Sequence, residues 1–393
     1  MTDWPEFRLG DLVLINYRSI DKDYPYKQIE YLDTGSITDG KITSFQTLFL
    51  REAPSRAKRI VQNNDVILSM VRPIQRHYGF IKNVKPNMIV STGFVVLTCK
   101  EKIEPYYLYS FLTQREITEY LDVVAEGSTS AYPAFTPEVL ENMAILLPPL
   151  PEQRAIAAVL SSMDDKIDLL NRQNKTLEGL AETSWRKMFV EDAKDTWNET
   201  NLEEICTITR GASPRPIINY VIDGTVPWIK IADATASSSY FIYKTHEFIT
   251  EDGMRKSVKV HPGDLILSNS ATCGFPYFVD VEGCIHDGWL LFRNFKVVSK
   301  TFIFFFLKQL NRELNYIADG SVQNNLNTGL LKEYGLKLPP VNLIQKFDIL
   351  GNIIIDRIRQ NTIQIRTLSA LRDTLLPKLM SGGVRVEEFN NER

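Results

Sequence analysis

Hydrophobic residues recur in alternating steps of four and three along two long stretches of the chain. The first stretch lies between Pro151 and Ala193, and the second occupies the last part of the sequence. This alternation is the heptad pattern of a coiled coil, and a helix of about 40 residues is roughly 60 Å long. The two predicted seams are Ile156, Leu160, Met163, Ile167, Leu170, Asn174, Leu177, Ala181, Ser184, Met188 and Phe347, Gly351, Ile354, Ile358, Asn361, Ile365, Leu368, Arg372, Leu375, Leu379.

The two helical stretches belong to an internal repeat. Asp65–Ser69 (DVILS) returns as Asp264–Ser268 (DLILS), and Leu147–Leu150 (LPPL) returns as Leu338–Val341 (LPPV) at the start of each long helix. A repeat decides the architecture, so we expect two copies of one plan. A single long amphipathic helix usually just covers a core, but two at matching places favour pairing with each other. The predicted parts are 1–150, a globular domain; 151–194, a long helix; 195–341, a second globular domain; and 342–393, a long helix and tail.

The register of the helix pair follows from the two asparagines in the seams. In a parallel pairing Asn174 and Asn361 would each face an apolar residue, and each unsatisfied amide costs about 1–3 kcal/mol. In an antiparallel pairing Asn174 faces Asn361, and the apolar residues of the two seams face each other. Only Arg372 lacks a matching partner, and we expect its stem to lie on apolar surface with its head in water.

Each globular part is expected to hold short strands first and one apolar helix later. The helices are predicted at 106–121 and 302–317. Thr136 before Pro137 is typical of a helix N-cap, and Asn327–Thr328 has the same place in the second copy. The fold class is therefore α+β, with two similar globular domains separated by an antiparallel coiled coil.

Composition indicates an ordinary globular chain. Its 393 residues allow two to three domains, with 44% hydrophobic and 24% charged residues. The four cysteines show no pairing pattern, no secretory signal is visible at the start, and no apolar run is long enough for a membrane span. We expect a cytoplasmic protein in a reducing compartment. The net charge of −3 excludes a globally basic nucleic-acid binder, so any DNA affinity must come from local patches.

Motifs for catalysis are missing from the sequence. It has no Walker or GxGxxG loop, no HExxH and no GxSxG. Cys273, Cys284 and His286 have poor spacing for a metal site. We therefore expect no catalysis and no metal.

One stretch, 51–85, is strongly basic, with eight Lys and Arg against Glu52 and Asp65. Within it the run 72–78 (RPIQRHY) mixes guanidinium, amide and aromatic groups, which hold phosphates and read base edges. The alternative is a solvated basic surface. The predicted DNA-binding residues here are Arg51, Arg56, Lys58, Arg59, Arg72, Gln75, Arg76, His77 and Tyr78, with Ser128 and Thr129 in a later repeated loop.

The second globular part has no matching basic cluster. Candidates there are chosen by their place in the repeat, although such polar turn-formers are commonly plain turns. They are Arg210, Ser213, Arg215, Asn269, Thr272, Ser321, Gln323 and Asn324.

The duplicated plan resembles the specificity subunit of Type I restriction-modification enzymes. The resemblance is carried by 146–156 (LLPPLPEQRAI), by 376–382 (LPKLMSG) and by the long helices, and it spans nearly the whole chain. It implies two target recognition domains, each reading half of a bipartite asymmetric DNA sequence in phage defence. The second copy departs from the pattern, with 340–345 (PVNLIQ) in place of the Pro-Glu-Gln run, so its partner contact is expected to differ in detail.

The resemblance also implies partners. These are double-stranded DNA, two modification subunits that bind S-adenosylmethionine, and restriction subunits that hydrolyse ATP with Mg²⁺, while this chain binds no cofactor. We therefore interpret the chain as a non-catalytic reader of DNA sequence and an assembly scaffold. The alternative is a protein-interaction scaffold without DNA specificity, and a nuclease or methyltransferase comes third.

Overall fold

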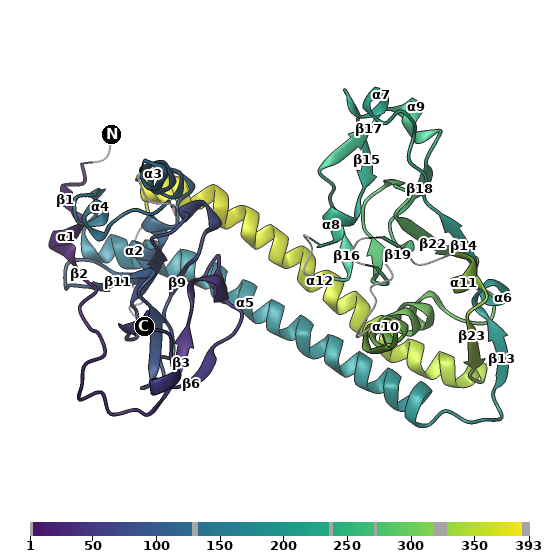
Figure 1. Ribbon diagram of the computed structural model, residues 1–393. Helices are drawn as coiled ribbons and strands as arrows, with labels where there is room; N and C mark the ends of the chain where they lie inside the picture. The colour runs from purple at the N-terminus through teal and green to yellow at the C-terminus, as the bar shows by residue number, and fades with distance from the viewer. Residues whose placement is uncertain (1–2, 128–132, 236–238, 271–272, 318–327, 387–393) are drawn as a thin grey trace, which may run out of the picture. The chain divides into compact units, whose positions relative to one another are not determined.

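The computed structural model describes residues 3–127, 133–235, 239–270, 273–317 and 328–386 (Figure 1). By internal contacts the chain forms two units, Met1–Ile167 with Thr367–Arg393, and Asp168–Arg366. Two long helices, α5 (Leu150–Arg186) and α12 (Val341–Met380), contribute to both units. These unit limits therefore lie inside the helices, whereas the divisions predicted from sequence lie near the helix ends.

The first unit contains two four-stranded sheets, ordered β6-β3-β10-β7 and β2-β11-β8-β9, and two small strand pairs, β1-β12 and β4-β5. Short helices follow the second sheet in the chain. Its elements are β1 (Glu6–Arg8), α1 (Leu9–Leu12), β2 (Val13–Ile15), β3 (Gln28–Leu32), β4 (Ile37–Thr38), β5 (Lys41–Ile42), β6 (Gln46–Phe49), β7 (Ala57–Ile60), β8 (Val66–Ser69), the 3₁₀ turn η3 (Pro73–Gln75), β9 (Tyr78–Phe80), β10 (Met88–Ser91), β11 (Phe94–Cys99), α2 (Pro105–Leu112), α3 (Arg115–Glu126), α4 (Pro137–Glu141) and β12 (Ala144–Leu146).

The second unit has the same plan in its described residues. A five-stranded sheet, β14-β22-β19-β20-β16, accompanies a four-stranded one, β17-β15-β21-β18, and the pair β13-β23. Its elements are β13 (Asn198–Asn201), α6 (Leu202–Ile205), β14 (Thr207–Arg210), α7 (Ile218–Val221), β15 (Val226–Ile229), α8 (Ile231–Thr235), β16 (Phe241–Ile242), β17 (Glu247–Ile249), α9 (Glu251–Met254), β18 (Val258–Val260), β19 (Leu265–Ser268), β20 (Pro276–Val279), β21 (Gly283–Ile285), β22 (Trp289–Arg293), α10 (Lys300–Ile317), α11 (Thr328–Lys332) and β23 (Gly335–Leu338).

The repeated sequence forms the same local structure in both units. β8 and β19 are fully buried strands, as their apolar runs predict. Before each strand an aspartate accepts a hydrogen bond from a backbone N–H three residues earlier, Asp65 from Gln62 and Asp264 from His261, both at 2.8 Å. The turn residue ahead of each aspartate is left-handed, with φ of 70° at Asn64 and 92° at Gly263. The predicted α+β repeat is thus present in the fold.

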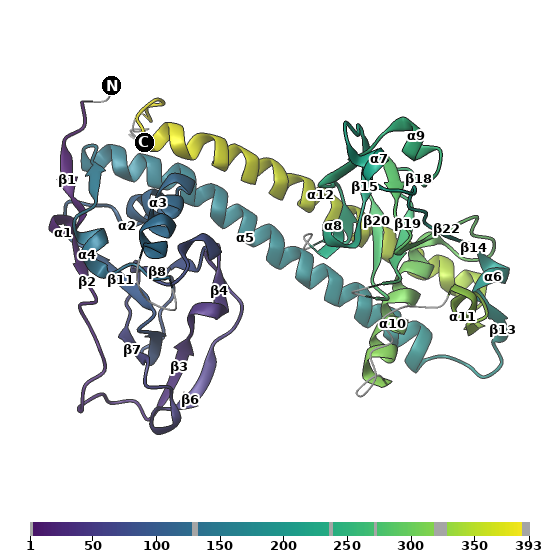
Figure 2. The same cartoon turned by 45° about the horizontal axis from the view of Figure 1, so that its top comes forward.

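Segments of α5 and α12 run antiparallel to each other within each unit (Figures 1 and 2). In the second unit Asn361 Nδ2 donates to Asn174 Oδ1 at 2.9 Å, and both side chains are buried. This is the contact that the sequence register predicts. In the same unit the rings of Trp185 and Phe347 meet edge to face at 5.3 Å between centroids. In the first unit Ile156 of α5 and Leu379 of α12 share one buried cluster.

Two expectations about helices need correction, and a third is confirmed in position. The helix predicted at 106–121 is two helices, because the chain turns at Thr113, whose hydroxyl donates to the Tyr109 carbonyl at 2.9 Å. The long helix predicted to 194 ends as an α-helix at Arg186 and continues as a π turn over Lys187–Glu191. The predicted N-cap position of Thr136 before Pro137 is confirmed at the start of α4, although the Thr136 side chain makes no capping hydrogen bond. Asn327, its counterpart, lies outside the described residues.

The Pro-Glu-Gln run at the start of α5 holds the first unit together. The amide of Gln153 is buried and makes three hydrogen bonds, donating to the carbonyls of Lys102 and Pro148 and accepting from the N–H of Glu104. Glu152 accepts from the indole of Trp4 and pairs with Arg385 at 2.8 Å. In the second copy the place of Gln153 is taken by Ile344, which is also buried. Where the two copies differ in sequence, the first unit therefore has a buried, hydrogen-bonded amide and the second unit has a buried apolar side chain.

Within the described residues all four cysteines are free, and no group of three or more metal-ligating side chains occurs. Burial raises the pKa of the Cys206 thiol to about 12, as expected for a cysteine in a core. No described helix is both long and apolar enough to cross a membrane.

The Asn174–Asn361 pair predicts an asymmetric response to substitution. Asn174→Leu leaves the buried Asn361 amide without its partner, so the free energy of unfolding should fall by about 1–3 kcal/mol. Replacing both asparagines by leucine should recover most of this loss, because no unpaired amide remains. Urea denaturation of the three proteins measures both effects. A double variant as unstable as Asn174→Leu would contradict this account.

Candidate nucleic-acid interface

The basic run 72–78 forms a tight loop between strands β8 and β9. Its centre is the 3₁₀ turn η3, and the residues on either side of it, Arg72 and Arg76, are left-handed with φ of 47° and 58°. Left-handed backbone is uncommon for residues other than glycine, asparagine and aspartate and costs free energy. The loop is therefore held in this shape by the contacts around it.

Backbone hydrogen bonds hold the loop from both sides. The N–H of Arg72 donates to the Pro133 carbonyl at 3.1 Å, and the N–H of Ile74 donates to Asp122 Oδ1 of α3 at 3.1 Å. Within the turn, the N–H of Gln75 donates to the Arg72 carbonyl at 2.9 Å. A loop with this many backbone partners presents its side chains in a fixed geometry.

Four residues of the loop are exposed, Arg72, Ile74, Gln75 and Arg76, and of these only Arg76 is held by an ion pair within the described residues. In the part of the chain that the structure describes, neither the Arg72 guanidinium nor the Gln75 amide has a hydrogen bond or ion pair. Their donors and acceptors are available to a ligand. An exposed guanidinium and amide on a rigid turn suit contacts to guanine and adenine edges.

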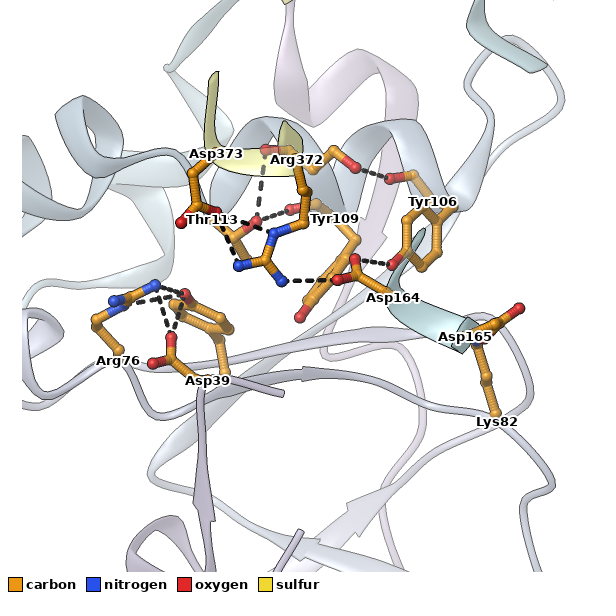
Figure 3. Close-up of polar contacts among 12 residues, drawn as sticks. Asp39, Arg76, Lys82, Tyr106, Tyr109, Thr113, Asp164, Asp165, Arg372 and Asp373 are labelled. Atoms are coloured by element: carbon orange, nitrogen blue, oxygen red, sulfur yellow. Dashed lines mark hydrogen bonds and ion pairs between the residues drawn. The ribbon is translucent and has the colours of Figure 1, made fainter. Parts of the chain in front are cut away.

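The other end of the loop is anchored to its own unit. Arg76 pairs with Asp39 at 2.7 Å and donates from Nε to the Tyr78 hydroxyl at 3.1 Å, and that hydroxyl donates to Asp39 Oδ1 at 2.8 Å (Figure 3). Burial, followed by the charge of Asp39, raises the pKa of Tyr78 to about 12. His77 Nδ1 bonds the Ile37 carbonyl at 2.5 Å.

Tyr78, which the sequence predicts as a DNA contact, is instead buried at 4% exposure and does not face outward. The reason is the pleat of β9, which turns Tyr78 toward the core while Arg72 and Gln75 stay on the turn before it. Arg76 and His77 are partly occupied by Asp39 and the Ile37 carbonyl.

Four of the other six basic residues of 51–85 form ion pairs within the unit. Arg56 pairs with Asp33 at 2.8 Å, and Arg51 pairs with its neighbour Glu52 at 3.1 Å. The acids in these ion pairs offset much of the positive charge that 51–85 carries in the sequence. Lys82 and Lys85, which belong to the run but were not assigned to DNA, pair with Asp165 and Glu30.

Lys58 and Arg59 sit on β7 and differ in exposure. Lys58 is exposed, and no ion pair to it occurs within the described residues. Arg59 is half-buried: its Nη1 donates to Ser19 at 3.4 Å, and burial lowers its pKa. Lys58 therefore fits the predicted phosphate contact better than Arg59 does.

The second unit brings three predicted residues together around Asp287. Arg210 Nε donates to the Asp287 carbonyl at 2.9 Å, Ser213 donates to Oδ1 at 2.6 Å, and Arg215 lies 3.6 Å from Oδ2. The hydrogen bond from Ser213 lowers the pKa of Asp287. Asp287 is not among the residues predicted from the sequence.

Asn269 does not lie where it was expected. Its side chain is 2% exposed, its backbone N–H donates to the Gly288 carbonyl at 2.8 Å, and its buried Oδ1 has no partner among the described residues. A side chain this buried is not a surface contact, and the Asn269 backbone is tied to Gly288 by the same hydrogen bond. The remaining candidates lie outside the described residues, namely Ser128, Thr129, Thr272, Ser321, Gln323 and Asn324.

A second polar cluster joins the long helices to the first unit. Arg372 of α12 donates to Asp164 of α5 at 2.6 Å, and the hydroxyl of Tyr106 donates to the same carboxylate at 2.6 Å (Figure 3). Burial lowers the pKa of Arg372, but its hydrogen bond to Asp164 and the charges of Asp164 and Asp373 outweigh this and raise it. The head of Arg372 is thus half-buried in a polar cluster and not in water as expected.

The chain matches the family model described as Type I restriction modification DNA specificity domain, over residues 1–179 and 194–366. It therefore belongs to this family of DNA-recognition proteins. Specificity subunits of Type I systems are not catalytic, and catalysis lies in their partner subunits. Family membership favours the interpretation as a DNA reader over the scaffold and enzyme alternatives.

Similar proteins support the same assignment. The chain is 23% identical to the Type I restriction enzyme HindI specificity subunit of Haemophilus influenzae, with 98% of this chain and 100% of that protein covered. It is 25% identical to the MjaIX specificity subunit of Methanocaldococcus jannaschii, over 84% of this chain and 80% of that protein. The fold is similar to that of the Type I restriction-modification S subunit from M. genitalium, with a TM-score of 0.62, 17% identity and 96% of each chain covered.

The half-buried Arg372–Asp164 pair predicts a measurable loss of stability. Arg372→Met keeps the apolar stem but leaves Asp164 without its charged partner, so the free energy of unfolding should fall by about 1–3 kcal/mol. Arg115→Met is the matched control, since it removes an exposed ion pair to Glu119 and should leave unfolding unchanged. Urea denaturation compares the two, and equal effects would contradict the proposed burial of the pair.

Proposed function

We propose that this chain reads a bipartite asymmetric DNA target, with one half-site for each globular domain. It acts as the recognition and assembly subunit of a Type I complex. Two modification subunits and the restriction subunits join it there and carry S-adenosylmethionine, ATP and Mg²⁺. The observation that carries this proposal is a duplicated frame whose loops differ between the two copies.

The duplicated frame consists of the buried strands β8 and β19 and the hydrogen bonds at their ends. The loop that follows each of these strands is called the reading loop of its unit. The first residue after the buried strand donates its N–H to the carbonyl of a glycine, Met70 to Gly93 at 3.0 Å and Asn269 to Gly288 at 2.8 Å. The frame is therefore the same in both copies. The side chains within it are not, since exposed Arg72 and Gln75 have no counterpart in the described part of the second loop. Two equal frames with different loops suit two half-sites of different sequence.

The helix pair is proposed as the coiled coil that sets the distance between half-sites. Its support is the uninterrupted α5 and α12 together with the amide pair that selects one register. A pair of helices with one register has a definite length, and that length is independent of the reading loops.

Methylation mapping tests the proposed function directly. The chain would be produced with its modification subunits, and methylated sites in the host DNA would be sequenced. We expect one asymmetric motif made of two short half-sites with an unspecified spacer. Methylation without a sequence motif, or duplex binding that is the same for all sequences, would overturn the proposal and favour the scaffold without DNA specificity.

Two substitutions in the first domain should have different signatures. Arg72→Ala should cost about 1–3 kcal/mol of binding to the target and relax one base position, as expected for a bidentate contact. Lys58→Ala should weaken binding to all sequences alike and reduce the salt dependence by about one phosphate contact. Binding of the assembled enzyme to target and scrambled duplexes at several salt concentrations measures both. Identical specificity in Arg72→Ala and wild type would exclude the arginine as a base reader.

Lengthening the helix pair should change the spacer alone. Seven residues inserted after Ile167 and seven after Thr367 add one heptad to each helix and keep the predicted seam in register. The added length is about 10 Å, at 1.5 Å per residue, which corresponds to about three base pairs at 3.4 Å each. Methylation mapping should show unchanged half-sites with a spacer longer by about that amount. New half-site bases with the old spacer would contradict the role of the helices.

A further inference from the structure

The reading loop of the first unit carries an aliphatic side chain at its outermost turn. Ile74 is 54% exposed, although the residue before it, Pro73, is buried. A single exposed aliphatic residue is ordinary on a protein surface. This one differs because it stands between the exposed side chains of Arg72 and Gln75 on a turn flanked by left-handed residues.

The position of Ile74 is determined by contacts with the rest of the unit. Asp122 of α3 accepts a hydrogen bond from its N–H, and the N–H of Arg76 closes the turn onto the Pro73 carbonyl at 2.8 Å. The cluster of Arg76, Tyr78 and Asp39 then fixes the end of the loop. Strained backbone that is held by surrounding structure is concentrated at functional sites. The contacts keep Ile74 outward and rigid.

The neighbours of Ile74 determine which ligand chemistry it suits. A guanidinium and an amide match the acceptors and donors at the edges of guanine and adenine in the major groove. The one apolar group displayed along that groove is the 5-methyl of thymine, and it is absent from the minor groove. An aliphatic side chain between Arg72 and Gln75 would therefore face either water or a thymine methyl.

We propose that Ile74 is a specificity-determining residue that contacts the 5-methyl group of a thymine in the half-site read by the first domain. The inference rests on the proposed function and adds an apolar contact to the polar readout by Arg72 and Gln75. Asp122, Arg76 and Tyr78 are positioning residues for this contact, because they hold the turn and do not face the ligand.

The test replaces thymine by deoxyuridine, which removes only the methyl group. The assembled enzyme would be titrated with target duplexes in which each thymine of the first half-site is replaced in turn. For the wild-type enzyme one replacement should weaken binding roughly fourfold, the effect of withdrawing one methyl-sized group from burial. Ile74→Ala should bind the thymine duplex more weakly and lose the difference between thymine and deoxyuridine. Ile74→Val should retain that difference, because its side chain keeps two methyl groups.

Controls separate this inference from the proposed function. Deoxyuridine in the other half-site should affect wild type and Ile74→Ala equally. If the wild-type enzyme shows no sequence-specific binding, the proposed function fails. If specific binding is present but Ile74→Ala keeps the full preference for thymine, or the half-site contains no thymine, only the role of Ile74 is overturned. Loss of complex assembly in Ile74→Ala, measured by size-exclusion chromatography, would also overturn it.

Discussion

The hydrogen bond between Asn174 and Asn361 is the interaction on which the pairing of the two long helices depends. An apolar seam alone tolerates a shift by a heptad, because one leucine packs much like another. A buried amide does not, since a shifted register would leave both asparagines without partners at about 1–3 kcal/mol each. One polar pair in an apolar seam therefore selects a register at some cost in stability. The core of each unit includes residues of both helices, such as Leu160 and Leu379 in the first unit and Trp185 and Ile354 in the second.

The helices are parts of the folded units as well as connections between repeats. Ile156 and Leu160 of α5 lie in the core of the first unit, and Trp185 lies in the core of the second. The start of α5 also connects two segments that are far apart in the sequence, because Glu152 accepts hydrogen bonds from Trp4 and Arg385. The motif that carries the family resemblance in the first copy thus has a direct structural role. In the second copy Ile344 takes the place of Gln153 with an apolar side chain. The repeated fold therefore does not require the same side-chain chemistry in both copies.

Charge pairing decides which part of the basic stretch can meet DNA. Acids from distant turns and loops pair with Arg56 and Arg76, and the Tyr78 hydroxyl also accepts hydrogen bonds from Arg76. Lys58 and Arg72 are left exposed without ion pairs among the described residues. A rigid turn with few free donors favours specific contacts, whereas an unpaired basic stretch would favour binding to any sequence.

The sequence by itself determined the repeat, the long helices and their register. The repeat and the helices follow from spacing along the sequence. The register follows from the cost of burying an amide without a hydrogen-bond partner. Only the tertiary structure decided which members of 72–78 face outward, that Asn269 is buried, and that Arg372 pairs with Asp164. Each of these depends on residues far away in the chain, such as Asp39, which pairs with Arg76, and Gly288, whose carbonyl accepts from the Asn269 N–H. Ile74 was overlooked for the same reason, because an isoleucine in a sequence indicates burial until the structure shows it exposed at 54%.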